Sequence, residues 1–430
     1  MSATTTTTTT TPPPQPHKTT LILITPCNKD HTRAAFHAEL AAMEQTHQKA
    51  TASMQRAMAS LTTPNTLQLK QTIQQRALDQ HALYCHNVSA LKQIYRQSQS
   101  HVIHVPPPPP AAPPATKDTC AMGGYYLFKT LEREYGSNEN NRATKVNDVT
   151  MSLLHKHYPT VKEQRWQNNT TSTLRVLIPG IGLLGLAHCL LVWFQSSSCA
   201  TTNKKKDNDH HHLMIDGCDL SLSSLLLGTG MLSMLHTAPT TTIDSPLTIY
   251  PEASLTSIID TPNRPTVLYN TTSSSAASPP PTSTTSLTTS SIVRVFHQDF
   301  HAMATSPSNL TEHLIVITQF FLDAVPNIIQ TMEQIIRRLA SAGGGLWINV
   351  GPLKYYGHHA HGPTLTWQEI LLYLNSCTNV EILESTRADN VSYFGDQGQS
   401  STVNPETYTC CCFVVFVGGL KSATKKKEKL

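Results

Sequence analysis

Short apolar runs recur through the second half of the chain, and polar or helical stretches separate them. The runs have the composition of buried strands: LRVLI (174–178), HLMIDGCDL (212–220), IVRVFHQDF (292–300), HLIVITQFF (313–321) and LWINV (346–350), with VEILEST and CCCFVVFV as closing strands. From Val325 to Leu339, apolar residues are instead spaced i, i+3 or i+4, which is typical of a helix packed on a sheet. This alternation predicts an α/β fold with a mostly parallel, doubly wound sheet.

The first half of the chain has a different pattern. Residues 1–30 form a Thr/Pro-rich stretch that we expect to be a disordered tail. Residues 31–105 carry apolar positions at helical spacing, divided at Pro64, and predict an N-terminal helical region. Residues 106–121 are a Pro-rich linker, and a further helical block from Tyr125 to Tyr158 leads into the strands.

The main domain therefore spans residues 122–418, with a basic tail at 419–430. Two low-complexity inserts interrupt it, near 195–211 and 238–290. Within the second insert, LTIYPEA and the run around Arg264 are less monotonous, and we expect order there.

A glycine-rich segment, LRVLIPGIGLLGLA (174–187), follows the order strand, turn and helix. Gly180 and Gly182 would let a ligand approach the backbone at the start of the new helix. The run from Val176 to Phe194 has no charged residue, and about 18 such residues are the minimum for a membrane span. Its proline and glycines, and His188 in its middle, argue against a span, so we expect no membrane contact.

Composition narrows the class of protein further. The net charge is only +4 and basic residues are not interleaved with aromatic ones, so we expect no nucleic-acid partner. The N-terminal residues contain no apolar leader segment, so we expect the ten cysteines to lie in a reducing compartment. They form no C-x-x-C pair, and we expect no metal site.

Acidic residues follow three successive predicted strands: Asp219, Asp299 and Asp323. The carboxyl ends of parallel strands form the ligand-binding edge of such a sheet. A single Asp at a strand end is more often a helix cap than a ligand. Three of them beside a glycine turn indicate a nucleoside-containing ligand, although spacing alone does not separate NAD from S-adenosylmethionine.

Together these motifs resemble the carnosine N-methyltransferase family. The resemblance is carried by PGIGLLGLA (179–187), IDGCDLSLSSLLL (215–227), LTIYP (247–251), QDF (298–300), FFLDAVPNII (320–329) and GLWINVGPLKYY (345–356). It covers residues 122–417, and more weakly the helical region from His31. It implies a Rossmann-like class I methyltransferase sheet of seven strands that uses S-adenosylmethionine and methylates the imidazole of carnosine to give anserine.

The resemblance also assigns roles to individual residues. The expected cofactor contacts are Arg133 at the methionine carboxylate, Gly180 and Gly182 at the methionine end, Asp219 at the ribose, and Asp299, Phe300 and Gln319 near the adenine. Asp323 is the expected catalytic acid that faces the imidazole, and the expected substrate wall is formed by Tyr356, Tyr393 and Tyr408. The chain departs from the family pattern at Thr130, Leu184, Gly185 and Tyr356.

Other interpretations stay open at this stage. The chain could be a methyltransferase of the same fold for another histidine-containing peptide, or an inactive protein that binds a partner through its helical N-terminus. An NAD-dependent dehydrogenase fits the order of elements poorly. For the leading interpretation we expect a dipeptide substrate, a cytoplasmic location that can extend to the nucleus, and a homodimer as a candidate oligomeric state.

Overall fold

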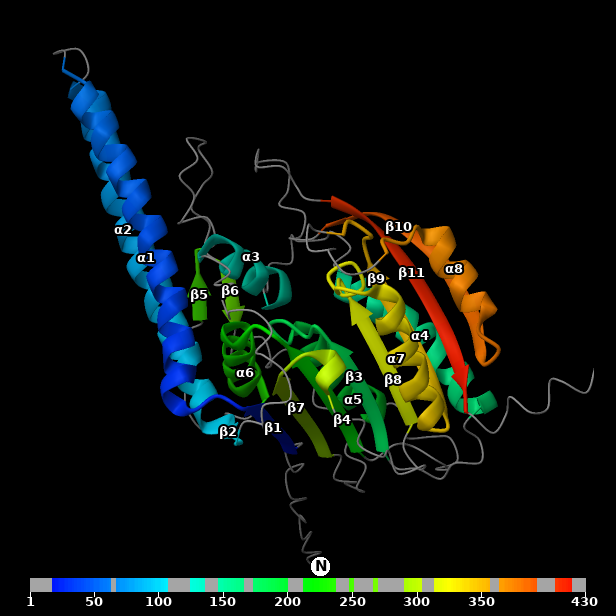
Figure 1. The fold of residues 1–430 in the computed structure, drawn as a ribbon. Coiled ribbons are helices and arrows are strands. Elements are labelled where there is room, and N and C mark those ends of the chain that lie inside the picture. The colour runs from blue at the N-terminus through cyan, green and yellow to red at the C-terminus, as the bar shows by residue number, and fades with distance from the viewer. Residues whose placement is uncertain are drawn as a thin grey trace, which may run out of the picture.

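The computed structural model describes residues 18–62, 67–106, 124–135, 146–165, 173–199, 212–236, 247–250, 266–269, 290–303, 313–355, 363–392 and 407–419. Its centre is one nine-stranded sheet in the order β10-β11-β9-β8-β3-β4-β7-β1-β2 (Figure 1). The strands are β1 Lys18–Thr25, β2 Val102–His104, β3 Thr173–Pro179, β4 His212–Asp219, β7 Ser290–His297, β8 His313–Gln319, β9 Gly344–Gly351, β10 Val380–Ser392 and β11 Thr407–Gly418.

Neighbouring strands of this sheet run parallel except at β11, which is antiparallel to both β9 and β10. The predicted strands and their mostly parallel order are therefore confirmed. The expected number of seven is not, because β1 and β2 add two more strands beyond β7. Residues 1–30 were expected to form a disordered tail, but β1 pairs in parallel with β7 over Lys18–Ile24.

β1 forms a strand because its sequence, KTTLILIT, alternates between the two faces of the sheet. Leu21 and Leu23 are buried, whereas Ile22 and Ile24 are half-buried. This alternation is short and follows a Thr/Pro-rich stretch, so it does not stand out in the sequence. The two strands that pair with β1, namely β2 and β7, are also distant from it in sequence. The tail prediction was therefore wrong for the residues of β1.

Helices cover both faces of the sheet, as a doubly wound fold requires. One face packs against α4 (Val146–Arg165), α5 (Gly185–Cys199) and α6 (Leu222–His236). The other packs against α7 (Ile328–Ser341) and α8 (Trp367–Ser376). The i, i+3/i+4 pattern on α7 buries Met332, Ile335 and Leu339 against the strands, as predicted.

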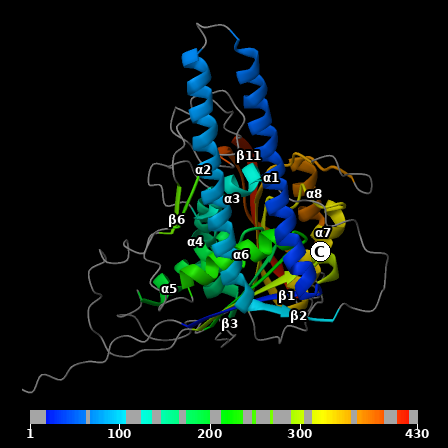
Figure 2. The ribbon, with the colours of Figure 1, turned by 90° about the vertical axis from the view of Figure 1, so that its left-hand side faces the viewer.

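Two long helices, α1 (Lys29–Ser60) and α2 (Leu67–Ser98), lie side by side and extend away from the sheet (Figures 1 and 2). Their bases join a third apolar cluster with α3 (Gly124–Tyr135) and α6. A 3-10 turn, Gln99–His101, leads from α2 into β2. The predicted helical region is thus a hairpin attached to the main domain near the end of the sheet.

The predicted inserts are only partly described. α5 continues to Cys199, so the first insert begins later than expected, and its remainder lies outside the described residues. In the second insert, β5 (Leu247–Ile249) and β6 (Thr266–Tyr269) pair as a small antiparallel sheet, which agrees with the order expected at LTIYPEA and just after Arg264. Almost all residues of the predicted Pro-rich linker and of the predicted basic tail lie outside the described residues. Across the described helices, none is both long and apolar enough to cross a membrane.

Candidate active site

The strand order reverses between β3 and β8, because the chain continues from β3 to β4 and β7 on one side and from β8 to β9 on the other. Ligands of open α/β sheets bind outside the carboxyl ends of the strands at such a point. The glycine turn follows β3, and the segment from Phe320 to Asp323 follows β8. The topology therefore brings the glycine turn and Asp323 to the same edge of the sheet.

The glycine turn needs glycine for two reasons. Gly180 and Gly182 have φ values of +67° and +55°, in the left-handed region that side chains rarely adopt. A Cβ added at Gly180 would lie 2.8 Å from the ring of Phe321. The Gly180 N–H donates to the Cys218 carbonyl at the end of β4, at 2.8 Å. The turn is thus held closely between the ends of β4 and β8.

Two side chains of helix α3 form hydrogen bonds to the glycine turn, and the sequence analysis did not predict either contact. The Gly185 N–H, at the start of α5, donates to Glu134 Oε2 at 2.7 Å. The buried Tyr135 hydroxyl donates to the Leu183 carbonyl at 2.5 Å. Burial raises the pKa of Tyr135 well above its usual value, so this hydroxyl keeps its proton at neutral pH. The two bonds fix α3 beside the glycine turn.

Arg133 lies in α3 directly before these two residues. Its side chain is outside the described part of the structure, so its predicted contact with the cofactor carboxylate stays a prediction. Glu134 and Tyr135 belong to the same LEREYG run. In the sequence, Glu134 and Tyr135 are distinguished only by lying next to Arg133. Nothing in the pattern predicts that they contact the glycine turn.

The Glu134 carboxylate occupies the N-terminus of α5. In phosphate-binding folds, the N–H groups of this helix end point at the phosphate. Here one of them is already bonded to a carboxylate, whose negative charge would repel a phosphate. The arrangement suits a ligand that brings positive charge, or none, to this end of the cleft.

Asp219, at the end of β4, is bonded to the same turn. Its Oδ2 accepts from the Gly182 N–H at 3.0 Å, and its Oδ1 accepts from the Ser221 N–H at 2.8 Å. Burial raises the pKa of Asp219, and these N–H groups oppose the shift. A carboxylate has about four acceptor positions, so each oxygen can accept a further hydroxyl hydrogen bond. The structure brings Asp219, Gly180 and Gly182 together, as predicted.

The three residues expected near the adenine have contacts within the protein. Asp299 caps a 3-10 turn (Phe300–Ala302) by accepting from the His301 N–H at 2.7 Å. Phe300 is buried, and the Arg338 guanidinium lies 4.8 Å from the centre of its ring. Gln319 donates through Nε2 to Asn147 Oδ1 at 2.9 Å and to Thr150 Oγ1 at 3.0 Å, both on α4. Their predicted roles at the adenine stay predictions, and their observed roles are capping and packing.

Asp323 and Tyr408 both contact Lys354. Asp323 is buried, and its Oδ2 accepts from the Lys354 N–H at 3.3 Å. The Lys354 ammonium lies 3.8 Å from the centre of the Tyr408 ring, which also makes an edge-on contact with Phe320 at 5.7 Å. The predicted catalytic acid and one predicted substrate tyrosine therefore share one neighbourhood. Lys354 is a residue of this site that the sequence analysis missed.

Backbone strain is concentrated around the same edge. Leu184, Phe320 and Tyr355 have φ values of +66°, +50° and +47°, and they are the described non-glycine residues with positive φ. They lie in the glycine turn, after β8 and after β9. Such conformations cost of order 1–3 kcal/mol each and are typical of ligand-binding sites. At Leu184, where the sequence departs from the family pattern, the backbone still adopts a conformation that favours glycine.

A pocket of about 710 Å³ opens beside Tyr408 and Lys354. Arg387 of β10 lines it, so two cationic side chains face the same space. Tyr356 and Tyr393 lie outside the described residues, and their predicted contacts stay predictions. Within the described part of the chain, no group of three His, Cys, Asp or Glu side chains is placed to hold a metal ion.

Solved structures of several methyltransferases are similar to this chain at low sequence identity. Among solved structures, magnesium protoporphyrin IX methyltransferase from Synechocystis with bound SAM is 12% identical, covering 71% of this chain and 100% of that one, with a TM-score of 0.31. The Haemonchus contortus phosphoethanolamine N-methyltransferase 2 is 10% identical, covering 70% and 58%, with a TM-score of 0.30.

The comparison with curated proteins gave no match. The model of the carnosine N-methyltransferase family matches residues 269–417, which include Asp299, Asp323 and Tyr408. For residues 269–417, this match confirms the resemblance to the carnosine N-methyltransferase family that the sequence motifs indicate.

Proposed function

We propose that the protein is an S-adenosylmethionine-dependent N-methyltransferase that acts on the imidazole of carnosine, β-alanyl-histidine, and gives anserine. The family match supports the reaction class, and the edge built from the glycine turn, Asp219 and Asp323 supports the site. A cytoplasmic or nuclear location and a homodimer are further parts of the proposal.

The observation that carries the choice of cofactor is the carboxylate of Glu134 on the Gly185 N–H. A dinucleotide pyrophosphate would have to displace this carboxylate or lie beside its charge. S-adenosylmethionine has no phosphate, and when bound it supplies a methyl group on a positively charged sulfur. Gly180 and Gly182 would hold its methionine end by close backbone approach, and Asp219 would accept its ribose hydroxyls.

Asp323 would act on the substrate. A neutral imidazole attacks through one ring nitrogen while the other carries a proton. A carboxylate that accepts this N–H selects the reactive tautomer and stabilises the positive charge that develops on the ring. The burial of Asp323 strengthens this interaction, since the local dielectric constant is lower than that of water. Asp323 can then accept the proton and pass it to solvent.

The pocket lined by Lys354 and Tyr408 would hold the remainder of a histidine-containing dipeptide, since the Lys354 N–H also bonds to Asp323. Its cationic residues, Lys354 and Arg387, are suited to the substrate carboxylate, and the Arg387 guanidinium can bind a carboxylate through two hydrogen bonds. Tyr408 would form an aromatic wall next to the imidazole. Because the pocket is open, a histidine at the end of a longer peptide is the second candidate substrate.

The direct experiment is a methyl-transfer assay with purified protein and labelled S-adenosylmethionine. Carnosine, homocarnosine and free histidine are supplied in parallel, and the product is identified by mass spectrometry. We expect transfer to an imidazole nitrogen of carnosine. Cofactor binding without transfer to any of these substrates would reject carnosine-type activity, and absence of cofactor binding would favour an inactive binding protein.

A further inference from the structure

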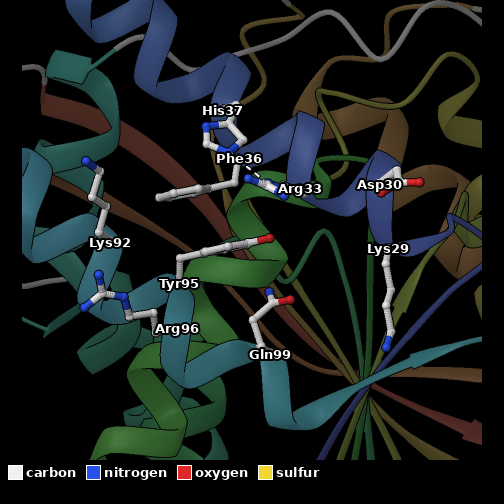
Figure 3. A pocket seen from close by; sticks show the side chains of 9 residues that line it. All are labelled: Lys29, Asp30, Arg33, Phe36, His37, Lys92, Tyr95, Arg96 and Gln99. Atoms are coloured by element: carbon white, nitrogen blue, oxygen red, sulfur yellow. Dashed lines mark hydrogen bonds between the residues drawn. The ribbon is translucent and has the colours of Figure 1, made fainter.

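A second pocket lies between the bases of α1 and α2, and it shares no lining residue with the pocket beside Tyr408 and Lys354. Its volume is about 510 Å³. Lys29 and Arg33 line it from α1, and Lys92 and Arg96 line it from α2 (Figure 3). Asp30 is the acidic residue of the lining, and Figure 3 shows its carboxylate, like the charged ends of Lys29, Lys92 and Arg96, pointing outward from the rings of Phe36 and Tyr95. Two helices thus contribute four cationic side chains to one groove.

The spacing of these cations is unfavourable for the protein alone. Lys29 and Arg33 are four residues apart on one helix, and Lys92 and Arg96 are four residues apart on the other. Like charges at this spacing destabilise a helix by roughly 0.2–0.5 kcal/mol per pair. Among the residues that the structure describes, none of the four forms a salt bridge. An anion long enough to reach both helices would reduce the repulsion on each of them.

The groove has a rigid floor. The rings of Phe36 and Tyr95 stack with centroids 4.0 Å apart and an angle of 2° between their planes. Phe36 is buried, so the pair joins α1 to α2 through the apolar cluster below. Arg33 Nε donates to His37 Nε2 at 3.4 Å, which restricts the guanidinium. The cations are therefore presented from a fixed scaffold, which lowers the entropic cost of binding.

We propose that this groove binds a soluble small molecule that carries two or more phosphate groups. Guanidinium groups bind phosphate oxygens through paired hydrogen bonds, and lysines add point charges. Four cations against one carboxylate leave a surplus of three positive charges, which matches a polyphosphate better than a single carboxylate. The volume lies within the range of small-molecule sites. The proposal does not depend on methyltransferase activity.

Isothermal titration calorimetry on the full chain tests this site, with tripolyphosphate and ATP as probes. We expect both to bind, and binding to weaken as ionic strength rises. The double variant Arg33→Ala/Arg96→Ala removes one guanidinium from each helix and should weaken binding at least 30-fold, since each charged hydrogen bond contributes roughly tenfold. The matched control is Arg56→Ala/Arg76→Ala, which removes exposed arginines from the same helices outside the pocket.

The control should retain the affinity of the unaltered protein within about twofold, on the usual scale for independent surface sites. Circular dichroism should show that both double variants keep the helical content of the parent. Equal loss of affinity in the two double variants would overturn the proposal, because binding would then follow net charge alone. Failure of both probes to bind, or binding only to vesicles that contain phosphatidylinositol bisphosphate, would also overturn it.

Discussion

Replacing Glu134 by glutamine removes the charge at the start of α5 and keeps the size of the side chain. The bond to the Gly185 N–H measures 2.7 Å, within the range of charge-assisted hydrogen bonds. Such a bond contributes about 1.5–3 kcal/mol, against about 0.5–1.5 kcal/mol for a neutral one. The carboxylate also interacts with the helix dipole, worth about 0.3–1 kcal/mol. We expect the free energy of unfolding to fall by about 1–2 kcal/mol in total.

Urea denaturation followed by circular dichroism measures this change. Glu163→Gln is the matched control, because Glu163 is exposed on α4 and the same charge is lost there. A ligand comparison adds a second readout. Glu134→Gln should weaken the binding of S-adenosylmethionine more than that of S-adenosylhomocysteine, whose sulfur is uncharged. Unchanged stability, together with equal effects on the two ligands, would refute the role given to Glu134.

Further predictions concern the glycine turn, the pocket lined by Arg387 and the dependence of stability on pH. Gly180→Ala should destabilise the fold by about 1–3 kcal/mol more than Gly343→Ala in urea titrations. Both glycines have positive φ, but only at Gly180 does a Cβ meet a neighbour within 4 Å. Arg387→Ala should raise KM for carnosine roughly tenfold, as expected for a lost charged hydrogen bond, and leave KM for β-alanyl-histamine, which has no carboxylate, unchanged. The pKa of His236 is lowered to about 4 by burial and by the neighbouring His188, so the folded state excludes a proton that the unfolded chain binds below about 6.5. Stability should therefore fall by about 2 kcal/mol from pH 8 to pH 5, and His236→Asn should remove that part of the slope in urea titrations at each pH. An equal slope in this variant would contradict the assignment.

The sequence predicted the elements whose signal is local. The strands that carry Asp219 and Asp323 were found because buried parallel strands are short continuous apolar runs. The helix after Asp323 was found because its apolar residues repeat at helical spacing. Both signals depend on residues within one element, and the structure places these elements where the pattern indicates.

Contacts between distant elements could not be predicted in the same way. β1 pairs with β7, which lies far along the chain, and its alternation is too short to stand out beside the Thr-rich tail. Glu134 and Tyr135 act on the glycine turn only because α3 folds back across it. Lys354 lies next to a predicted strand, yet only the approach of β11 brings its ammonium to Tyr408. These contacts are set by packing rather than by periodicity.

The role of Asp323 is the central claim, and the Asp323→Asn variant tests it most directly. Single-turnover methyl transfer to carnosine and the Kd for S-adenosylmethionine are measured on the same preparation. The variant keeps a carbonyl oxygen but loses the charge that stabilises the imidazole, so the rate should fall by about 10²–10⁴-fold, the usual contribution of a positioned acid or base. The Kd should change by less than about threefold, because in the proposed function Asp323 contacts the substrate and not the cofactor. A rate close to that of the unaltered protein, or losses of equal size in rate and cofactor affinity, would contradict the account.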